Sequence, residues 1–321
     1  MRTPAAVFWC LLLLFPVQRI VRVDAFTGTY GINYGRIADN IPAPENVVSI
    51  LKAIKIKNVK IFDSDHGVLK AFKGSGLELV VGLSNDYVKE INSSEDRAME
   101  WVKDNVQSWL PDTKITGIAV GNEVLGGETW SWKRPSYKSD PEHINLSYAL
   151  FLPNAGIVDP KTNLHYDNMF DATIDAAYTA LEAAGYGKME VEVTETGWAS
   201  SGDEDETGAT AQNARIYNFN LRKRLFKRKG TPLRPKVVMK AYVFALFNED
   251  LKPGPGSERH YGLFKADGSI SYDIGFSGLS NLHTSSSPST QKEFYAGGWL
   301  APNSLVLFTC IWIAVHLYVR Y

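Results

Sequence analysis

The sequence predicts an α/β fold built on a parallel β-sheet, and three observations favour it. Short apolar runs alternate along the chain with segments whose apolar residues recur on a helical period. No hairpin turn signal separates one apolar run from the next, so successive strands are expected to be parallel and joined by helices. About 250 residues lie between two apolar terminal segments, a length that suits a (β/α)8 barrel of the TIM type.

The first half of the chain provides four strand-like runs with helical segments between them. The run 77–83 is nearly all apolar, which is typical of a parallel strand covered on both faces. Pro44 is expected in the first turn of the first helix, and Asp96 is expected to cap the third. The expected strands are 29–34, 59–62, 77–83 and 115–120, and the expected helices are 44–54, 68–73 and 96–109.

The second half continues the same alternation with longer helices. A helix is expected over 171–184, where Gly185 ends it, and a second over 209–229. Strands are expected at 189–194 and 237–247. These two strands bring the total to only six, whereas a closed barrel of this type needs eight.

Two of the expected strands end on a glutamate. The alternating run from Val191 leads to Glu195, Gly197 and Trp198, and the apolar run 115–120 leads to Gly121-Asn122-Glu123. Taken singly, the first is equally well read as a solvated acid on an edge strand, and the second as an ordinary turn. Together they favour glycoside hydrolysis, which needs two carboxyl groups flanking one bond.

Composition excludes several other functions. The chain is 45% hydrophobic and 21% charged with a net charge of −1, so nothing in it favours a nucleic-acid partner. The six histidines show no paired spacing of metal ligands, and we expect no metal site and no cofactor. The basic run 222–229 is expected to be a solvated helix face, and the acidic run 203–206 an exposed loop.

Both termini have the pattern of processing signals. Residues 1–25 are expected to be a signal peptide, because an apolar run follows Arg2 and ends near small residues. Residues 281–298 form a Ser-rich spacer, and 299–321 an apolar tail. This arrangement favours a GPI-anchor signal over a membrane-spanning tail, although about 20 apolar residues can also cross a bilayer. The mature domain is therefore expected at 26–280, outside the cell.

Cysteines and glycosylation motifs agree with secretion. Cys10 and Cys310 are the two cysteines, and both fall in the terminal segments, so the mature domain is expected to contain no disulfide. Asn92 and Asn145 begin Asn-X-Ser sequences and are expected glycosylation acceptors in a secreted chain.

A set of motifs, in a fixed order, resembles the plant glucan endo-1,3-β-glucosidases of glycoside hydrolase family 17. The resemblance covers Phe26 to about Phe276, and the order of the motifs makes it specific. The motifs are YGINYG at 30–35, NIPAP at 40–44, VGNE at 120–123, TETGW at 194–198, FNEDLKPG at 247–254, Glu258-Arg259, and YGLF at 261–264.

The resemblance implies a retaining mechanism carried by the two strand-end glutamates. Glu123 looks like the general acid/base that protonates the glycosidic oxygen, and Glu195 looks like the nucleophile that forms the glycosyl-enzyme. Retention requires the two carboxyl groups to lie about 5–5.5 Å apart. Asn122 resembles the residue that hydrogen-bonds the 2-hydroxyl of the sugar.

The resemblance also implies a set of substrate-binding side chains. Glu249, Lys252 and Glu258 match a charged cluster that lines the cleft, in which the lysine holds Glu195 anionic; the alternative is a surface ion-pair network. Three aromatic residues are candidate platforms for sugar rings, although a core role fits the last of them equally well. They are Tyr34, Trp198 and Phe247.

One departure from the family pattern concerns the barrel itself. Glu123 and Glu195 lie only 72 positions apart, yet the fourth and seventh strands of such a barrel are separated by three βα steps of about 30 residues each. The family pattern breaks off near Gly127 and resumes at Tyr137. We therefore expect an incomplete barrel that lacks the fifth and sixth βα units.

The sequence thus predicts a retaining endo-hydrolase of 1,3-β-glucan of the callose or laminarin type, anchored at the cell surface or wall. Its expected partners are the polysaccharide and, through its tail, a membrane, and a monomer is expected. Two alternatives remain open: a non-hydrolytic glucan-binding wall protein, and an inactive variant of the hydrolase that lacks two βα units.

Overall fold

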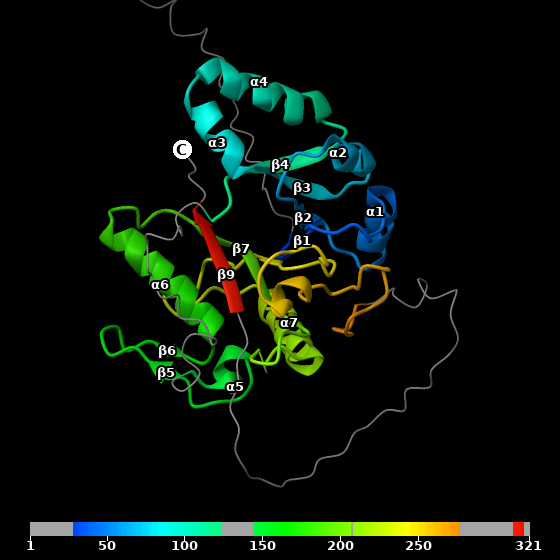
Figure 1. The fold of residues 1–321 in the computed structure, drawn as a ribbon. Coiled ribbons are helices and arrows are strands. Elements are labelled where there is room, and N and C mark those ends of the chain that lie inside the picture. The colour runs from blue at the N-terminus through cyan, green and yellow to red at the C-terminus, as the bar shows by residue number, and fades with distance from the viewer. Residues whose placement is uncertain (1–27, 124–143, 207, 277–310, 318–321) are drawn as a thin grey trace, which may run out of the picture.

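The computed structural model describes residues 28–123, 144–206, 208–276 and 311–317. Its main sheet has the strand order β4-β3-β2-β1-β8-β7-β9, and β5 and β6 form a separate antiparallel pair (Figure 1). The strands of the main sheet are β1 (Tyr30–Asn33), β2 (Asn58–Lys60), β3 (Glu78–Leu83), β4 (Lys114–Val120), β7 (Val191–Trp198), β8 (Ala241–Val243) and β9 (Ile311–Leu317); the pair is β5 (Ile157–Val158) and β6 (His165–Tyr166).

The predicted parallel sheet is confirmed for the six strands β1, β2, β3, β4, β7 and β8. Each of these strands is parallel to its neighbours among them. Among the described strands of the main sheet, only β9 runs antiparallel, beside β7. In the described part of the chain the sheet ends at β4 on one side and at β9 on the other.

Helices connect the strands, as predicted, and side-chain caps start four of them, including α5, which is capped by Asn145. Asp65 accepts a hydrogen bond from the Val68 amide at α2, and Asn168 and Thr210 cap α6 and α7 in the same way. The helices are α1 (Pro44–Ala53), α2 (His66–Phe72), α3 (Asn85–Asn92), α4 (Glu95–Asn105), α5 (Leu146–Ala149), α6 (Met169–Ala183) and α7 (Ala211–Phe226), with 3-10 turns η1 (Gln107–Trp109) and η2 (Gly256–Arg259).

Several details differ from the sequence-based expectation. The strand expected at 237–247 is limited to β8 (Ala241–Val243), the strand expected at 189–194 continues to Trp198 in β7, and the antiparallel pair β5–β6 was not expected. The prediction that Asp96 caps α4 is wrong: the N-cap residue is Ser94, and Asp96 lies in the first turn. Helix α3 was not expected, because its apolar residues are too few to stand out from a loop. It begins directly after β3 and positions Asn85 beside the end of β4.

The core lies between the sheet and the helices that cover it. Strands β1, β2 and β3 are buried along their whole length. Helices α1 and α2 contribute Leu51 and Phe72, and α6 and α7 contribute Ile174 and Leu221, all with at most 1% of their surface exposed. Burial of each such side chain stabilises the fold by about 1.5–3 kcal/mol.

The β4 side of the sheet is less well covered. Val120, at the end of β4, is 59% exposed, and α4 has no buried residue. Strand β4 pairs with β3 on one side, and its burial is intermediate over most of its length. This part of the fold therefore contributes less to the core than β1 to β3 do.

Part of the predicted apolar tail is described by the structure. Residues 311–317 form β9 along β7, from Ile311 beside Trp198 to Leu317 beside Val191 (Figure 1). The predicted signal peptide and Ser-rich spacer lie outside the described residues, as do 299–310 and 318–321. Within the described ranges, no helix is long and apolar enough to cross a membrane.

Candidate active site

Glu195 lies on β7 and forms an ion pair with a lysine from another strand. Its Oε1 atom is 2.6 Å from Nζ of Lys60, at the end of β2, and the two side chains are 10% and 2% exposed. The pairing of β7 with β8 shifts register between Val193 and Thr196. Irregularities of this kind redirect side chains next to active sites, and this one falls at Glu195.

Lys60 is the main site residue that the sequence-based prediction missed. Burial lowers the pKa of its ammonium, and the negative charges of Glu195 and Glu123 offset part of that decrease. The signal in the sequence was a lysine inside the otherwise apolar run Val59-Lys60-Ile61. A lysine almost never becomes fully buried without a partner, so its position implied a carboxylate from elsewhere in the chain.

Glu123 lies just beyond β4, in a turn held by a side chain from α3. Gly121 has φ 72° and Glu123 has φ 52°, both in the left-handed region, which non-glycine residues adopt rarely and often at functional sites. Asn85 accepts a hydrogen bond from the Asn122 amide (2.7 Å) and donates one to the Asn122 carbonyl (2.8 Å). Asn85 therefore sets the backbone next to Glu123.

The side chain of Asn122 has an unused acceptor. Its Oδ1 atom is buried and has no hydrogen-bond partner in the described part of the chain. A buried acceptor without a partner is costly in the free protein. A hydroxyl-rich ligand would supply the missing donor, which agrees with the predicted contact between Asn122 and a sugar hydroxyl.

Glu249 is buried against the end of β1. Its Oε1 accepts a hydrogen bond from the Ile37 amide (2.8 Å), and burial raises the pKa of its carboxyl, with Glu258 and Glu195 adding to the increase. A Cβ atom on Gly35 would lie 2.4 Å from Oε2 of Glu249. Gly35 is thus required for this close approach, and Glu249 is within electrostatic reach of Glu195.

Lys252 and Glu258 form a second ion pair, with Nζ and Oε2 3.1 Å apart. Their side chains are 21% and 13% exposed, which disfavours the alternative of a solvated surface network. Nζ of Lys252 also lies 4.1 Å from the ring centroid of Phe244. Lys60, and not Lys252, forms the ion pair with Glu195.

These groups make one connected charged site at the carboxyl ends of the parallel strands. Phe62 and Phe244 pack edge to face on one another. Nζ of Lys60 lies 4.3 Å from the Phe62 ring centroid, and Nζ of Lys252 lies over Phe244. The site combines the carboxylates of Glu195 on β7 and Glu123 just beyond β4, the buried Lys60, the partly exposed Lys252, and the unpaired amide oxygen of Asn122. This set suits acid/base and nucleophilic chemistry on a polyhydroxylated substrate.

Comparison with known proteins identifies the family. The family model described as "Glycosyl hydrolases family 17" matches residues 30–139 and 134–276, most of the chain. The chain belongs to glycosyl hydrolases family 17. It is 38% identical over 341 residues to glucan endo-1,3-beta-glucosidase 11 of Arabidopsis thaliana, covering 83% of this chain and 80% of the relative. Identity to glucan endo-1,3-beta-glucosidase 10 of the same plant is also 38%, over 355 residues, 87% of this chain and 82% of the relative.

Solved structures of family 17 glucanases have the same fold. CJP38, a beta-1,3-glucanase and allergen of Cryptomeria japonica pollen, superposes with a TM-score of 0.70 at 31% identity, over 78% of this chain and 99% of CJP38. A plant beta-glucan endohydrolase gives a TM-score of 0.69 at 29% identity, over 77% of this chain and all of that one. The predicted family is therefore confirmed, and the α/β fold with its parallel sheet matches the TIM-barrel glucanases.

The three predicted sugar platforms of this family 17 chain lie in its core. Tyr34 and Phe247 are each 1% exposed and pack edge to face on one another, with ring centroids 6.2 Å apart. Trp198 is fully buried against Tyr217, and its indole nitrogen donates to the Gly208 carbonyl (3.0 Å). A ring without an exposed face cannot stack on a sugar, so the platform prediction is wrong for all three in this structure.

Both predicted glycosylation acceptors are exposed. Asn92 is the last residue of α3, and Asn145 precedes α5, where its side chain accepts a hydrogen bond from the Ser147 amide. Exposure is compatible with modification, which remains a prediction.

Two charged runs that were expected to be solvated are partly structural. Arg224 pairs with the mostly buried Asp171 (Nη2 to Oδ1, 3.0 Å), so the basic run is not simply a solvated face. In the acidic run, Glu206 is 3% exposed. In both cases the charge is held by a partner distant in sequence, which the local pattern does not reveal.

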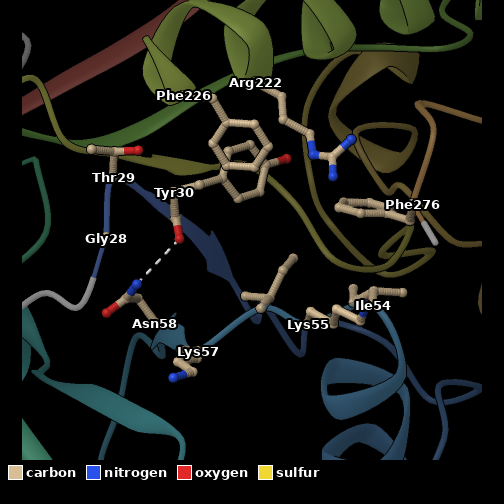
Figure 2. Close-up of a pocket in the computed structure, with 11 residues that line it drawn as sticks. Gly28, Thr29, Tyr30, Ile54, Lys55, Lys57, Asn58, Arg222, Phe226 and Phe276 are labelled. Carbon is tan, nitrogen blue, oxygen red and sulfur yellow. Dashed lines mark hydrogen bonds between the residues drawn. The ribbon is translucent and has the colours of Figure 1, made fainter. Parts of the chain in front are cut away.

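A separate hollow of about 260 Å³ lies at the amino ends of β1 and β2, opposite to the strand ends that carry the candidate site (Figure 2). Arg222 lies between the rings of Phe226 and Phe276, 4.9 Å from each centroid. It also donates to the Ile274 and Gly275 carbonyls. These contacts make Arg222 a brace of the fold, and the hollow is not part of the candidate active site.

Proposed function

We propose that this chain is a retaining endo-hydrolase of 1,3-β-glucan. The observation that carries the proposal is the buried Lys60–Glu195 ion pair, whose ammonium is also within the field of Glu123. Glu123 follows the carboxyl end of β4, and Glu195 on β7 lies next to Thr196, which pairs with the last residue of β8, Val243. Barrel enzymes bring their reacting groups together at this side of the sheet. The names of the family 17 relatives support 1,3-β-glucan as the substrate.

In the proposed reaction, Glu195 acts as the nucleophile. Its carboxylate forms a bond to the anomeric carbon while Glu123 gives its proton to the departing glycosidic oxygen. Glu123 then removes a proton from water, the water oxygen attacks the same carbon, and Glu195 leaves. The Lys60 ammonium donates a hydrogen bond to the Glu195 carboxylate before the attack and again after its release.

The test is hydrolysis of laminarin by the purified protein and by Glu195→Gln. The wild type should release oligosaccharides whose first-formed anomer is β, seen by proton NMR, and the variant should be at least a thousandfold slower, as is common for removal of a nucleophile. An α-anomer as the first product would exclude retention. Equal rates for the two proteins would exclude Glu195 as the nucleophile.

We further propose that the barrel lacks the fifth and sixth βα units of the family. The family match is divided into two segments that meet at 134–139. The alignment with glucan endo-1,3-beta-glucosidase 11 runs over 341 residues, more than the 321 of this chain, so the relative contains residues without a counterpart here. The short separation of β4 from β7 and the exposed end of β4 agree with such a loss.

The incomplete barrel supports a second candidate function, glucan binding without hydrolysis. Loss of two βα units removes the loops that follow two strands, and with them part of the substrate contacts. Laminarin binding by calorimetry without detectable cleavage would favour this function. A protein without a cooperative thermal transition would instead favour an inactive variant of the hydrolase.

We propose that the protein is secreted and held by a GPI anchor at the cell surface or wall, on the basis of its terminal sequence patterns. Removal of the tail by anchor attachment would also remove β9 and leave β7 uncovered. Phosphatidylinositol-specific phospholipase C should release the protein from intact cells. Retention after this treatment, with release by detergent alone, would favour a membrane-spanning tail. Sedimentation of the released protein tests the proposed monomer.

A further inference from the structure

The loop that follows β7 contains a buried carboxylate, that of Glu206, which accepts several hydrogen bonds and lies outside the candidate active site. Oε2 of Glu206 accepts hydrogen bonds from the amides of Ser257 (2.9 Å) and Asp203 (3.1 Å), and Oε1 accepts one from the Ser257 hydroxyl (2.6 Å). Asp203 Oδ2 accepts a further bond from the Gly256 amide (2.7 Å). The loop is thus joined to η2 at two successive residues.

Close packing makes this junction specific. A Cβ atom on Gly256 would lie 2.4 Å from Oδ1 of Asp203, so only glycine permits this approach. The same loop makes a third connection, because the Ser200 amide and hydroxyl both donate to the His260 carbonyl, at 2.8 and 3.0 Å. The end of β7 and the turn η2 therefore form one unit.

The next residue after Ser257 belongs to the candidate active site. Glu258 pairs with Lys252, and the ammonium of Lys252 lies over the ring of Phe244. Phe244 packs on Phe62, and the ring of Phe62 lies beside the ammonium of Lys60. Hydrogen bonds to an ionised acceptor are shorter and stronger than neutral ones. A carboxylate at Glu206 therefore holds the backbone of Ser257, and with it the direction of the Glu258 side chain.

We propose that Glu206, assisted by Asp203, is a positioning residue that sets the Lys252–Glu258 pair in the candidate cleft. This inference rests on the proposed function, because the pair is taken to contact the glucan. Glu206 itself touches neither the sugar nor the two reacting glutamates in this proposal; it acts through Ser257 and Glu258.

The test compares Glu206→Gln with Asp205→Asn, a matched change at an exposed acid of the same loop. Glutamine has the size of glutamate but no charge, and its amide NH2 group would face the hydrogen-bond donors of Ser257 or Asp203. We expect the ratio kcat/KM for laminarin to fall about tenfold to a hundredfold, with Asp205→Asn unchanged. If Glu206→Gln does not fold, Asp203→Asn, which removes a single acceptor, provides a milder version with a smaller loss.

A double-mutant cycle with Glu258→Gln separates positioning from general stability. If Glu206 acts through Glu258, adding Glu206→Gln to Glu258→Gln should cause little further loss of kcat/KM. A full additional loss, equal to that in the wild-type background, would overturn the proposal. Unchanged kcat/KM in Glu206→Gln would also overturn it.

Amide hydrogen exchange distinguishes failure of this inference from failure of the proposed function. If the wild type does not cleave laminarin, the proposed hydrolysis is wrong, and the cycle is then measured on laminarin binding. Exchange of the Ser257 and Gly256 amides should accelerate at least tenfold in Glu206→Gln and not in Asp205→Asn. Equal protection in both variants would exclude Glu206 as the group that holds this turn.

Discussion

Nζ of Lys60 lies 2.6 Å from Oε1 of Glu195, and the two residues are 135 positions apart in the chain. Strand β2 supplies the ammonium and β7 the carboxylate, with β1 and β8 between them in the sheet. The pair is nearly free of solvent, so loss of either partner would leave a buried charge without a counterion.

Replacement of Lys60 by methionine should both destabilise the protein and slow it. The unpaired, mostly buried carboxylate of Glu195 should lower the free energy of unfolding by about 3–5 kcal/mol, measured in urea. The rate constant kcat for laminarin should fall about a hundredfold, because a fixed charge beside the reacting group is lost.

Two comparisons control this prediction. Lys57→Met, at an exposed site on the same segment, should change the free energy of unfolding by no more than about 0.5 kcal/mol. The double variant Lys60→Met with Glu195→Gln should regain part of the lost stability but no activity. A double variant less stable than Lys60→Met alone would contradict the expected cost of a buried charge without a counterion.

Asn85→Ala should release the turn that carries Glu123. The two hydrogen bonds to Asn122 are lost, at a cost of about 0.5–1.5 kcal/mol each. Because Glu123 is the proposed general acid/base, kcat should fall about tenfold to a hundredfold while KM changes little. Asp86→Ala, the next and exposed residue of α3, should retain wild-type kinetics. A rise in KM alone would show that Asn85 serves binding instead.

Gly35→Ala should displace Glu249. The added Cβ would lie 2.4 Å from Oε2, too close without movement of either the carboxylate or the end of β1. We expect a loss of about 1–3 kcal/mol in the free energy of unfolding, the usual cost of overpacking. Gly187→Ala is the matched control, since its Cβ would meet only ordinary contacts at 3.5 Å. Equal thermal stability of the two variants would contradict the structure at Gly35.

Glu249→Gln should change how stability depends on pH. Burial raises the pKa of Glu249 above its ordinary value, so between the unfolded and folded pKa values the folded protein binds more protons than the unfolded chain. Its contribution to stability is therefore most favourable at low pH and is lost as pH rises through the folded pKa. Glutamine does not titrate and still accepts from the Ile37 amide.

Urea unfolding of wild type and Glu249→Gln from about pH 4 to pH 8 measures this effect. The stability of the variant relative to the wild type should increase as pH rises from about 4.3, the ordinary pKa of Glu. If the stability of Glu249→Gln relative to the wild type decreased over this range, the fold would favour the ionised form of Glu249, contrary to the effect of its burial.

Local patterns in the sequence determined much of the fold. The apolar runs at 59–62, 77–83 and 115–120 overlap β2, β3 and β4, and the helical segment 209–229 contains α7. Alternation of such runs with helices is a property of short windows, so it can be read without knowing which strands are neighbours. The same reasoning placed Glu123 just beyond the end of β4, whereas Glu195, expected at a strand end, lies within β7.

Only the tertiary structure decided which groups meet at the site. Lys60 reaches Glu195, Glu206 reaches Ser257, and Trp198 turns into the core, although nothing near these residues in sequence shows it. The physical reason is that a buried charge or ring is placed by partners from other elements, whose contacts depend on the strand order and register. The sequence by itself therefore determined the family, the parallel sheet and two glutamates as candidate catalytic residues, and the tertiary structure decided which side chains lie beside them.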